Sequence, residues 1–317
     1  MADLRVTLAC DHYDLIWPLK DGTVKPDGID LRILTLGQER HERMMRSGEY
    51  DACEIGVSHY LMAHLKEMPF KAIPVFIRRM FLHRFIYCHA GAQIHSLQDL
   101  RGKRVGIIRR SNMLALWLRG HLRHEFGIES EQITWVTSLG DVVEGSSSGK
   151  SQYQAVSPSE SLEGLLVAGK IDAMVVPQVI EPYRQRVPQV RRLFEDYKKE
   201  EIDYYRKTRI FPIMHLLIVR EDVLKKEPSV AVKLLVAFRE AKRQWDEYLR
   251  IPPRTALAWA SSLWEEERDI LGEDPWAYNV KDNMHTVQTI IRYAFEDGLI
   301  GTEPDVKDLF AESTFDI

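Results

Sequence analysis

Two short segments combine arginine with residues that recognise anions. Arg78-Arg79-Met80-Phe81-Leu82-His83-Arg84 follows an apolar run ending at Phe76, and Arg109-Arg110-Ser111-Asn112 follows the run Arg104–Ile108. A guanidinium group pairs in a bidentate manner with a carboxylate. In the second segment, the free N–H groups of a following helix would add to an anion site. The alternative for both segments is a solvated loop, with Ser111 or Asn112 acting only as a helix cap.

His83 is the first candidate for proton transfer. If the segment is extended, Arg79, Phe81 and His83 point to the same side, since successive strand residues alternate. They would then offer an anion clamp, an aromatic wall and a titratable group. A neighbouring arginine would lower the pKa of His83 and make its proton easier to give up. The alternative is a histidine satisfied by backbone groups, in which case His215 is the next candidate.

Other patterns give weaker indications of chemistry. His121 and His124, like His59 and His64, lack a third metal ligand at a diagnostic spacing, and a solvated helix face explains them better. The segment 145–151 has three residues between its glycines, where a phosphate loop needs four, and a flexible surface loop is favoured for 140–160. We therefore expect no cofactor and assign no metal ligands, and a metal requirement stays open.

The composition excludes several classes of protein. Of 317 residues, 45% are hydrophobic and 28% charged, a balance typical of globular proteins. The net charge of −4 and the lack of a basic run argue against nucleic-acid binding. No apolar run approaches the roughly 20 residues of a membrane span. Three scattered cysteines, Cys10, Cys53 and Cys88, and the lack of a signal-peptide pattern predict buried thiols and a cytoplasmic location.

Strand patterns alternate with helical patterns along the chain. The strands are expected at Leu4–Cys10, Ile29–Leu36, Asp51–Val57, Lys71–Phe76, Phe85–Cys88, Arg104–Ile108 and Phe211–Val219, and the helices at Glu39–Arg46, Tyr60–Lys66 and Val230–Leu249. The alternation predicts an α/β fold with mainly parallel sheets flanked by helices. Such sheets bind ligands at the carboxyl ends of their strands.

An internal echo predicts two lobes. Gly48-Glu49-Tyr50-Asp51-Ala52 recurs as Gly169-Lys170-Ile171-Asp172-Ala173, each after an amphipathic helix and before an apolar strand. Because the strand at Phe211–Val219 follows the second copy, the chain is expected to return to the first lobe there. The predicted division is 1–92 plus 212–317 for lobe one and 93–211 for lobe two, with an interlobe ligand cleft.

Several segments in order along the chain resemble a known family. They are Asp11-His12-Tyr13-Asp14, Pro74-Val75-Phe76 with Arg79, Phe81 and His83, Phe211-Pro212-Ile213-Met214-His215, Asp274-Pro275-Trp276-Ala277-Tyr278 with Asn283, and Arg292–Leu299. The chain resembles the 4,5-dihydroxyphthalate decarboxylase family, which is similar in fold to the type II periplasmic binding proteins. The sequence departs from the family pattern at Arg78, the Arg109-Arg110 pair, Asn279 and Phe295, in or near the expected site.

The resemblance implies decarboxylation of a dihydroxylated aromatic dicarboxylate such as 4,5-dihydroxyphthalate, giving protocatechuate and CO₂. A non-catalytic solute-binding protein for a small organic anion, in transport or sensing, is the alternative. The catalytic candidates are His83 and His215. The ligand-binding candidates are Tyr13, Ser58, Arg79, Phe81, Arg109, Ser111, Asn112 and Tyr278. The expected partner is a small aromatic or other organic carboxylate, with neither nucleic acid nor membrane, and a homo-oligomer remains open.

Overall fold

The computed structural model describes residues 4–143, 152–251 and 254–317. The chain divides into two compact units. The first unit comprises Met1–Arg79, Ile213–Val287 and Pro304–Ile317, and the second comprises Met80–Pro212 and Gln288–Glu303. The sequence had put the first crossing at 92–93 and had not separated 288–303 from lobe one. Each unit has its own sheet and is described by itself.

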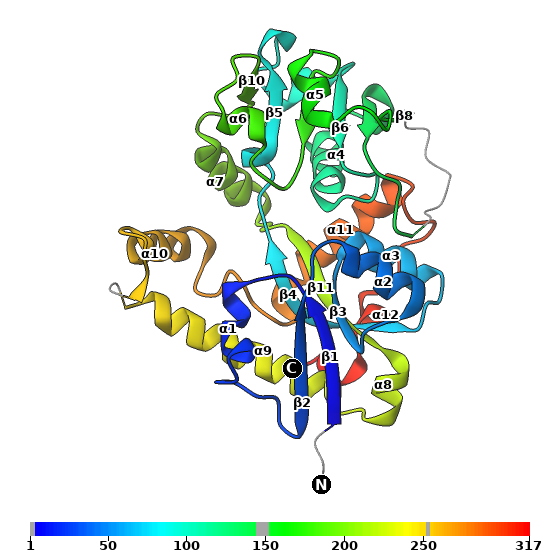
Figure 1. The fold of residues 1–317 in the computed structure, drawn as a ribbon, viewed down its shortest axis with the longest axis vertical. Helices are drawn as coiled ribbons and strands as arrows, with labels where there is room; N and C mark the ends of the chain where they lie inside the picture. Colours follow the sequence, from blue (N-terminus) through cyan, green and yellow to red (C-terminus); the bar gives the residue numbers. More distant parts are fainter. Residues whose placement is uncertain (1–3, 144–151, 252–253) are drawn as a thin grey trace. The chain divides into compact units, whose positions relative to one another are not determined.

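The first unit is built on a five-stranded sheet (Figure 1). Its strand order is β2 (Ile29–Thr35), β1 (Leu4–Cys10), β3 (Ala52–Gly56), β11 (Ile213–Arg220) and β4 (Phe70–Arg79). β1 is parallel to β2 and β3, whereas β11 is antiparallel to β3 and β4. β11 is therefore the one strand of this sheet that runs against the others.

Helices pack on the first sheet and bury its apolar side chains. They are α1 (Trp17–Lys20), α2 (Glu39–Ser47), α3 (Val57–Leu65), α8 (Glu221–Lys226), α9 (Val230–Leu249) and α12 (Val306–Leu309), with 3₁₀ turns at Asp14–Ile16, Lys281–Asn283 and Glu312–Thr314. α10 (Ala260–Leu271) contacts α9 instead and has no buried residue. The predicted helix Val230–Leu249 is confirmed as α9, and its residues Val230, Leu234, Ala237, Phe238 and Ala241 are buried in the core of this unit, with Trp245 half-buried. Burial of that stripe anchors a 20-residue helix that has little side-chain capping.

The second unit is built on a six-stranded sheet. Its order is β10 (Val190–Arg192), β5 (Ile86–His89), β9 (Ala173–Val175), β6 (Arg104–Ile107), β7 (Thr134–Thr137) and β8 (Gln152–Ala155). The helices are α4 (Met113–Phe126), α5 (Leu162–Val167), α6 (Glu181–Arg184) and α7 (Tyr197–Thr208), with 3₁₀ turns at His83–Phe85, Ala90–Ala92, Leu97–Leu100 and Ser130–Gln132. α11 (Met284–Glu296) contains the boundary between Val287 and Gln288.

Each sheet is mixed because one described strand runs against the others, β11 in the first and β5 in the second; the remaining strands are parallel, as the sequence predicts. In the second sheet β5 is antiparallel to β9 and β10, while β6 is parallel to β7 and β9. β5 was expected in lobe one, but it pairs with strands of the second sheet. β8 is a further correction, because residues 152–155 pair with β7 in a segment predicted as a loop. The segment 145–151 lies outside the described residues.

The internal echo is confirmed as a shared structural device. Gly48 and Gly169 adopt left-handed backbone, with φ of 58° and 66°, which glycine tolerates without a Cβ penalty. Three residues later, the Asp51 and Asp172 carboxylates accept the backbone N–H groups of Thr7 and Arg104, each at 2.8 Å. Each aspartate therefore ties the start of β3 or β9 to the neighbouring strand.

Two further predictions, on the cysteines and on membrane spans, are compared with the described residues. Cys10, Cys53 and Cys88 are free and buried, as expected. Within the described ranges, no helix combines the length and the apolar character that a membrane crossing requires.

Candidate functional site

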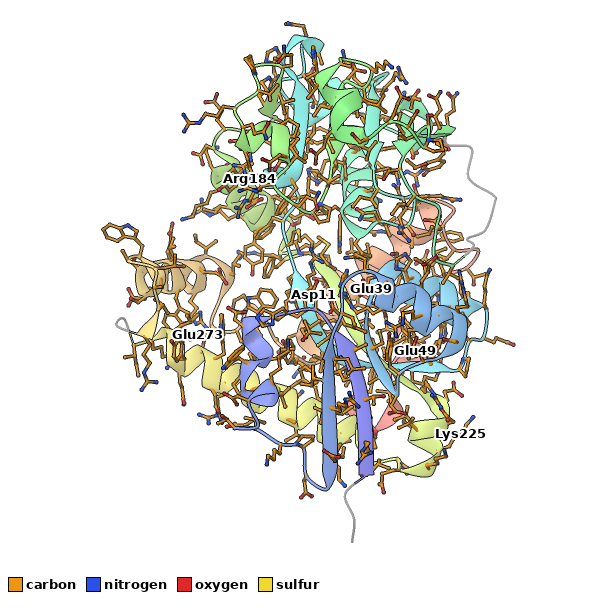
Figure 2. The ribbon with its side chains drawn as sticks, viewed as in Figure 1. Asp11, Glu39, Glu49, Arg184, Lys225 and Glu273 are labelled. Carbon is orange, nitrogen blue, oxygen red and sulfur yellow. The ribbon has the colours of Figure 1, made fainter. Side chains whose placement is uncertain are left out.

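The functional candidates of the first unit gather at one edge of its sheet. Because β11 runs against its neighbours, the carboxyl ends of β1 to β4 and the amino end of β11 share that edge. Asp11 follows β1 directly (Figure 2), Gly56 ends β3, Arg79 ends β4 and His215 lies near the start of β11. This is the edge at which open α/β sheets bind ligands.

Glu54 is the centre of a buried polar network, which we call the Glu54 cluster: Glu54, Arg40, Asp11, Tyr13 and His215. The Glu54 side chain is fully buried. Its Oε2 accepts the backbone N–H of Asp11 at 2.8 Å, and its Oε1 accepts the Tyr13 hydroxyl at 2.5 Å. His215 Nδ1 also bonds to Oε1. Both oxygens are thus engaged, so the carboxylate is held in one orientation.

Arg40 supplies the positive charge that keeps this carboxylate inside the protein. Its side chain is fully buried, and its Nη2 lies 2.8 Å from Glu54 Oε1 in an ion pair. Nη1 donates to the carbonyls of Leu36 and Gly37 at 2.9 and 2.7 Å, and Nε donates to the Glu54 carbonyl at 3.3 Å. Arg40 lies in the first turn of α2, so its side chain ties that helix to the loop after β2.

The pKa values of Glu54 and His215 are shifted in ways that fit an orienting role for Glu54. Burial alone would raise the pKa of the Glu54 carboxyl, but the His215 ring, the Arg40 guanidinium and the Tyr13 hydroxyl lower it to about 2. Burial lowers the pKa of His215, and the attraction of Glu54 does not reverse this. Glu54 is therefore ionised at neutral pH, and His215 is neutral with its Nδ1 hydrogen donated to Glu54.

The second ring nitrogen of His215, Nε2, takes no part in the bond to Glu54. The His215 backbone lies opposite Gly56 in the sheet, and the residue is 7% exposed. Among the described residues, none hydrogen-bonds to Nε2. The His41 ring stands edge-on to the His215 ring at 5.3 Å, and His59 lies 5.6 Å beyond His41. The neutral Nε2 is the atom best suited to accept and deliver a proton here.

The pairing of β4 with β11 is irregular near the end of β4, and the two arginines there, Arg78 and Arg79, differ in their contacts. Between the pairs Leu217↔Ile73 and His215↔Arg78 the register shifts, in a stretch that contains Pro74, which has no N–H to donate. Arg79, next along the strand, is buried and donates from Nη2 to Asn283 Oδ1 and to the Ala277 carbonyl at 3.5 Å. Arg79, predicted to clamp the ligand, thus binds the segment around Tyr278.

The remaining first-unit candidates are all buried or half-buried. Tyr13, a ligand-binding candidate from the sequence, donates its hydroxyl to Glu54. Ser58 is fully buried in the first turn of α3. The Tyr278 hydroxyl is buried, and no described residue hydrogen-bonds to it. Burial raises the pKa of Tyr278 strongly, so it remains a neutral donor.

In the second unit, the segment predicted to bind an anion forms hydrogen bonds with groups of the chain itself. Ser111 donates both its backbone N–H and its hydroxyl to Asp141 Oδ1, at 2.8 and 2.5 Å. The Asn112 side chain caps α4 by accepting the N–H of Ala115 at 3.2 Å, and the Arg109 carbonyl accepts the N–H of Asn112. A carboxylate of the chain itself therefore binds Ser111, the residue before the N-cap of α4, in the segment where a ligand anion was expected.

The expected surface of Arg79, Phe81 and His83 requires correction. β4 ends at Arg79, and His83 begins a 3₁₀ turn, so the segment is not extended through His83. Phe81 stacks on Phe211 with ring centres 4.9 Å apart. His83 is 3% exposed and lies among aromatic rings of the second unit: His121, Phe194 and Tyr204. Burial, followed by His121, lowers the pKa of His83 to about 3; the predicted arginine is not the cause.

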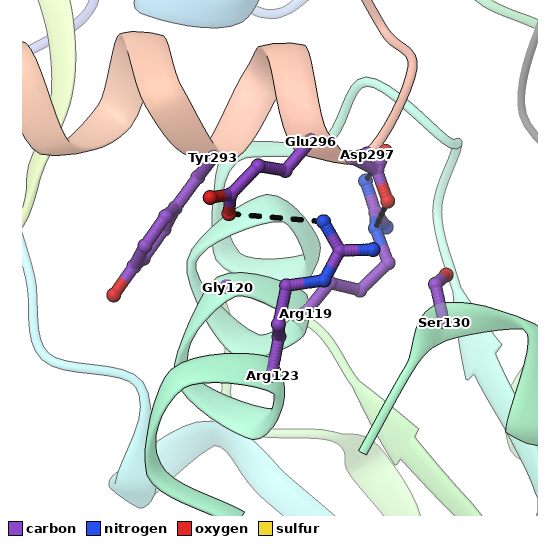
Figure 3. Close-up of a pocket in the computed structure, with 7 residues that line it drawn as sticks. All are labelled: Arg119, Gly120, Arg123, Ser130, Tyr293, Glu296 and Asp297. Atoms are coloured by element: carbon purple, nitrogen blue, oxygen red, sulfur yellow. Dashed lines mark hydrogen bonds and ion pairs between the residues drawn. The ribbon is translucent and has the colours of Figure 1, made fainter. Parts of the chain in front are cut away.

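A small surface pocket of about 210 Å³ lies in the second unit between α4 and the end of α11 (Figure 3). Arg119 donates to Asp297 through Nε and Nη2, at 2.7 and 3.0 Å. The Tyr293 ring lies against Gly120, where a Cβ would come within 1.9 Å of the ring. The charged residues pair with one another, so this contact fastens the 288–303 segment to its own unit.

Sequence reasoning missed the centre of the site. Arg40, His41, Glu54 and His59 were not singled out as ligand or catalytic residues. The signal for Glu54 was present, since it is one charged residue inside the apolar strand Ala52–Gly56, and buried charges are rare unless paired. Within the described residues, no three His, Cys, Asp or Glu side chains are arranged to hold a metal.

Comparison with solved structures defines the class of fold. The chain is similar to the periplasmic aliphatic sulphonate binding protein SsuA from Escherichia coli, with a TM-score of 0.53 and 13% identity over 98% of this chain and 92% of that one. It is also similar to the desulfurization enzyme DSZB, with a TM-score of 0.51 and 11% identity over 97% and 96%. At such identities the likeness shows the fold alone: a two-lobed α/β fold like that of type II periplasmic binding proteins.

Sequence comparison then defines the family. Residues 21–245 match the family described as ABC transporter, phosphonate, periplasmic substrate-binding protein. The chain is 30% identical to a 4,5-dihydroxyphthalate decarboxylase of Comamonas testosteroni, over 98% of this chain and 97% of that protein. The chain belongs to the 4,5-dihydroxyphthalate decarboxylase family, within the larger class that the fold defines.

Proposed function

We propose that this protein decarboxylates a hydroxylated aromatic carboxylate of the 4,5-dihydroxyphthalate type, releasing CO₂ and protocatechuate. The observation that carries the proposal is the buried pair of His215 and ionised Glu54 at the ligand-binding edge of the first sheet. A histidine whose far nitrogen is fixed by a carboxylate is the arrangement used for general acid–base chemistry. The family membership supports the same activity.

Decarboxylation of an aromatic acid needs one proton for each CO₂ released. The bond between the ring carbon and the carboxylate breaks, its electron pair stays on the ring carbon, and a proton must reach that carbon. A ring hydroxyl donates electron density toward it. In our proposal, His215 Nε2 takes a proton from solvent and passes it to the ring carbon. Burial lowers the pKa of His215, so its imidazolium gives up the proton readily.

Glu54 serves as a positioning residue in this scheme. Its carboxylate is bonded to Asp11, Tyr13 and His215 and has Arg40 as its ion-pair partner, so it is held in place within the cluster. It holds the His215 hydrogen on Nδ1, which directs the Nε2 lone pair outward, and it stabilises the imidazolium while that form exists. The proton donor in the proposal is therefore His215, and His83, the first candidate from the sequence, lies among aromatic rings of the second unit.

The direct experiment is to measure CO₂ release by the purified protein from a panel of aromatic acids. The panel contains 4,5-dihydroxyphthalate, phthalate and protocatechuate. We expect release from the dihydroxylated dicarboxylate and little from phthalate, which lacks the electron-donating hydroxyls. Binding of 4,5-dihydroxyphthalate without any release of CO₂ would contradict the proposal.

That second result would favour a non-catalytic binding protein for a small organic anion. The match of residues 21–245 to a family of periplasmic substrate-binding proteins supports this alternative. The two functions make different demands on His215, since a binding protein needs it only as a hydrogen-bonding group. Loss of turnover with retained affinity in a His215 variant would favour the enzyme.

A further inference from the structure

We propose that Arg78 binds the carboxylate that stays on the aromatic ring, and so selects ligands that keep an anionic group through the reaction. This inference rests on the proposed function, because it names the ligand group recognised beside His215. Arg78 was noted in the sequence as a departure from the family pattern, and was not among the candidate binding residues. Arg79 was expected to bind the carboxylate.

Arg78 differs from the other arginines at this edge in what it contacts. Arg40 pairs with Glu54, and Arg79 donates to Asn283 and Ala277. Arg78 is half-buried, and no residue in the described parts of the chain accepts a hydrogen bond from it or forms an ion pair with it. A half-buried guanidinium group without a protein acceptor has its donors available for a ligand.

The position of Arg78 places its charge beside the proton donor. In the register of β4 with β11, Arg78 lies directly opposite His215. Burial raises the pKa of Tyr13 and lowers that of His215, and in both cases the Arg78 charge contributes to the local potential. An anion at this point would therefore lie against Arg78 and within reach of the His215 ring.

Further positive potential at the same edge comes from a helix. α3 begins at Val57, and its N-cap Gly56 has no side chain to satisfy the first N–H groups. Gly56 is the residue paired with His215 in the sheet. Because His215 Nε2 has no partner among the described residues, the start of α3, Arg78 and His215 together suit a carboxylate.

The local charges explain why the occupant should be an external anion. Of the two carboxylates in the Glu54 cluster, Asp11 lies 4.0 Å from Arg40 Nη1 and accepts the N–H of His12. Glu54 forms its ion pair with Arg40. Neither carboxylate contacts Arg78, so within the described residues its counter-charge is missing. A planar guanidinium matches a carboxylate in a bidentate manner, which a lysine would not.

Binding of protocatechuate tests the inference without requiring turnover. Protocatechuate keeps the one carboxylate that Arg78 should hold, and catechol has the same ring and hydroxyls without a carboxylate. By calorimetry, Arg78→Met should weaken protocatechuate binding by about 10- to 100-fold, the range for hydrogen bonds to a charged group. Catechol binding should stay within about twofold. Arg78→Lys should recover only part of the affinity.

A matched control is Arg32→Met, which removes an exposed arginine from β2 of the same sheet. It should leave the affinity for protocatechuate unchanged. The inference is overturned if Arg78→Met keeps wild-type affinity for protocatechuate, if catechol is weakened equally, or if the wild-type protein binds no aromatic carboxylate. If carboxylates bind through Arg78 but no CO₂ is released, the proposed function alone has failed.

Discussion

The two units use the same strand arrangement but place different chemistry at equivalent positions. Ala52 of β3 pairs with Leu8 of β1, and Ala173 of β9 pairs with Val105 of β6, each after the shared glycine turn. Two residues further along, the first unit has Glu54 and the second has Val175. Both are fully buried, yet one is an ionised carboxylate with an arginine partner and the other an aliphatic side chain.

The two units also differ in the histidines near the antiparallel strands, β11 in the first sheet and β5 in the second. His215 lies near the start of β11, and His83 lies just before β5. The ring of His215 bonds to a carboxylate, whereas the ring of His83 contacts His121, Phe194 and Tyr204. Histidines near the start of the two reversed strands therefore have different surroundings: one is bonded to a carboxylate, and the other is packed among aromatic rings. The neighbours, and not the strand end, decide the chemistry.

The largest effect on stability is expected at Glu54. Glu54→Gln keeps the size of the side chain but leaves the fully buried Arg40 without its counter-charge. Loss of one partner from a buried ion pair destabilises by about 3–5 kcal/mol. Val175→Thr, at the equivalent position of the second unit, introduces a hydroxyl but no unpaired charge. Urea unfolding of both variants should show the larger loss at Glu54, and equal losses would remove the distinction between the units.

A second effect concerns acid sensitivity of the second unit. Burial lowers the pKa of His83 to about 3 and that of His121 to about 4, from an unfolded value of 6.5. Below pH 6.5 these two histidines are protonated in the unfolded chain but stay neutral in the folded chain. The free energy of unfolding therefore falls as the pH drops toward the folded pKa values. At pH 5 the loss relative to pH 8 is about 2 kcal/mol for each histidine.

Urea midpoints at pH 8 and pH 5 measure this loss. Replacing His83 with Phe, which suits its aromatic neighbours, should remove the contribution of that histidine and flatten the dependence. His95→Gln, at an exposed position of the same unit, should leave it unchanged. Glu54 acts in a different window, because its stabilisation holds above pH 4.5 and is lost as pH falls toward 2. A pH dependence that His83→Phe leaves intact would refute the assignment.

The smallest effect should be shared by the two units. Asp172 accepts one backbone N–H, from Arg104, and Asp51 accepts both the N–H and the hydroxyl of Thr7. Replacing either aspartate with Asn removes a charge-assisted bond and should cost about 1–2 kcal/mol, slightly more at Asp51. Thermal unfolding of the two single variants provides the comparison. A large loss in only one unit would mean that the echo is a coincidence of sequence.

Much of the fold could be predicted from local sequence patterns. The turns at Gly48 and Gly169, the bounds of α9 and the N-cap at Asn112 depend on neighbouring residues, and the structure agrees with them. The reversal of β5 and β11 could not be predicted, because strand direction is set by pairing between residues far apart in sequence. The point after Arg79 at which the chain passes from the first unit to the second could not be predicted either, because no change of composition marks that boundary.

The site was predicted less well than the fold, for a related reason. Single residues such as His215 were identified by type, but their partners come from distant segments: Arg40 from α2, Glu54 from β3 and Tyr13 from the loop after β1. The assumption of an extended chain misplaced His83. A strand that ends at Arg79 and turns at once moves the next side chains into a different environment.

The comparison of the two histidines gives the most direct test of the central claim. CO₂ release from 4,5-dihydroxyphthalate should be measured for His215→Asn and His83→Asn, together with the affinity of each for protocatechuate. Loss of a general acid lowers the rate by about 10²–10⁴, so His215→Asn should bind its ligand and turn over at least about a hundredfold more slowly. His83→Asn should retain activity within a few-fold at neutral pH. Normal turnover by His215→Asn, or its loss in His83→Asn alone, would contradict the account.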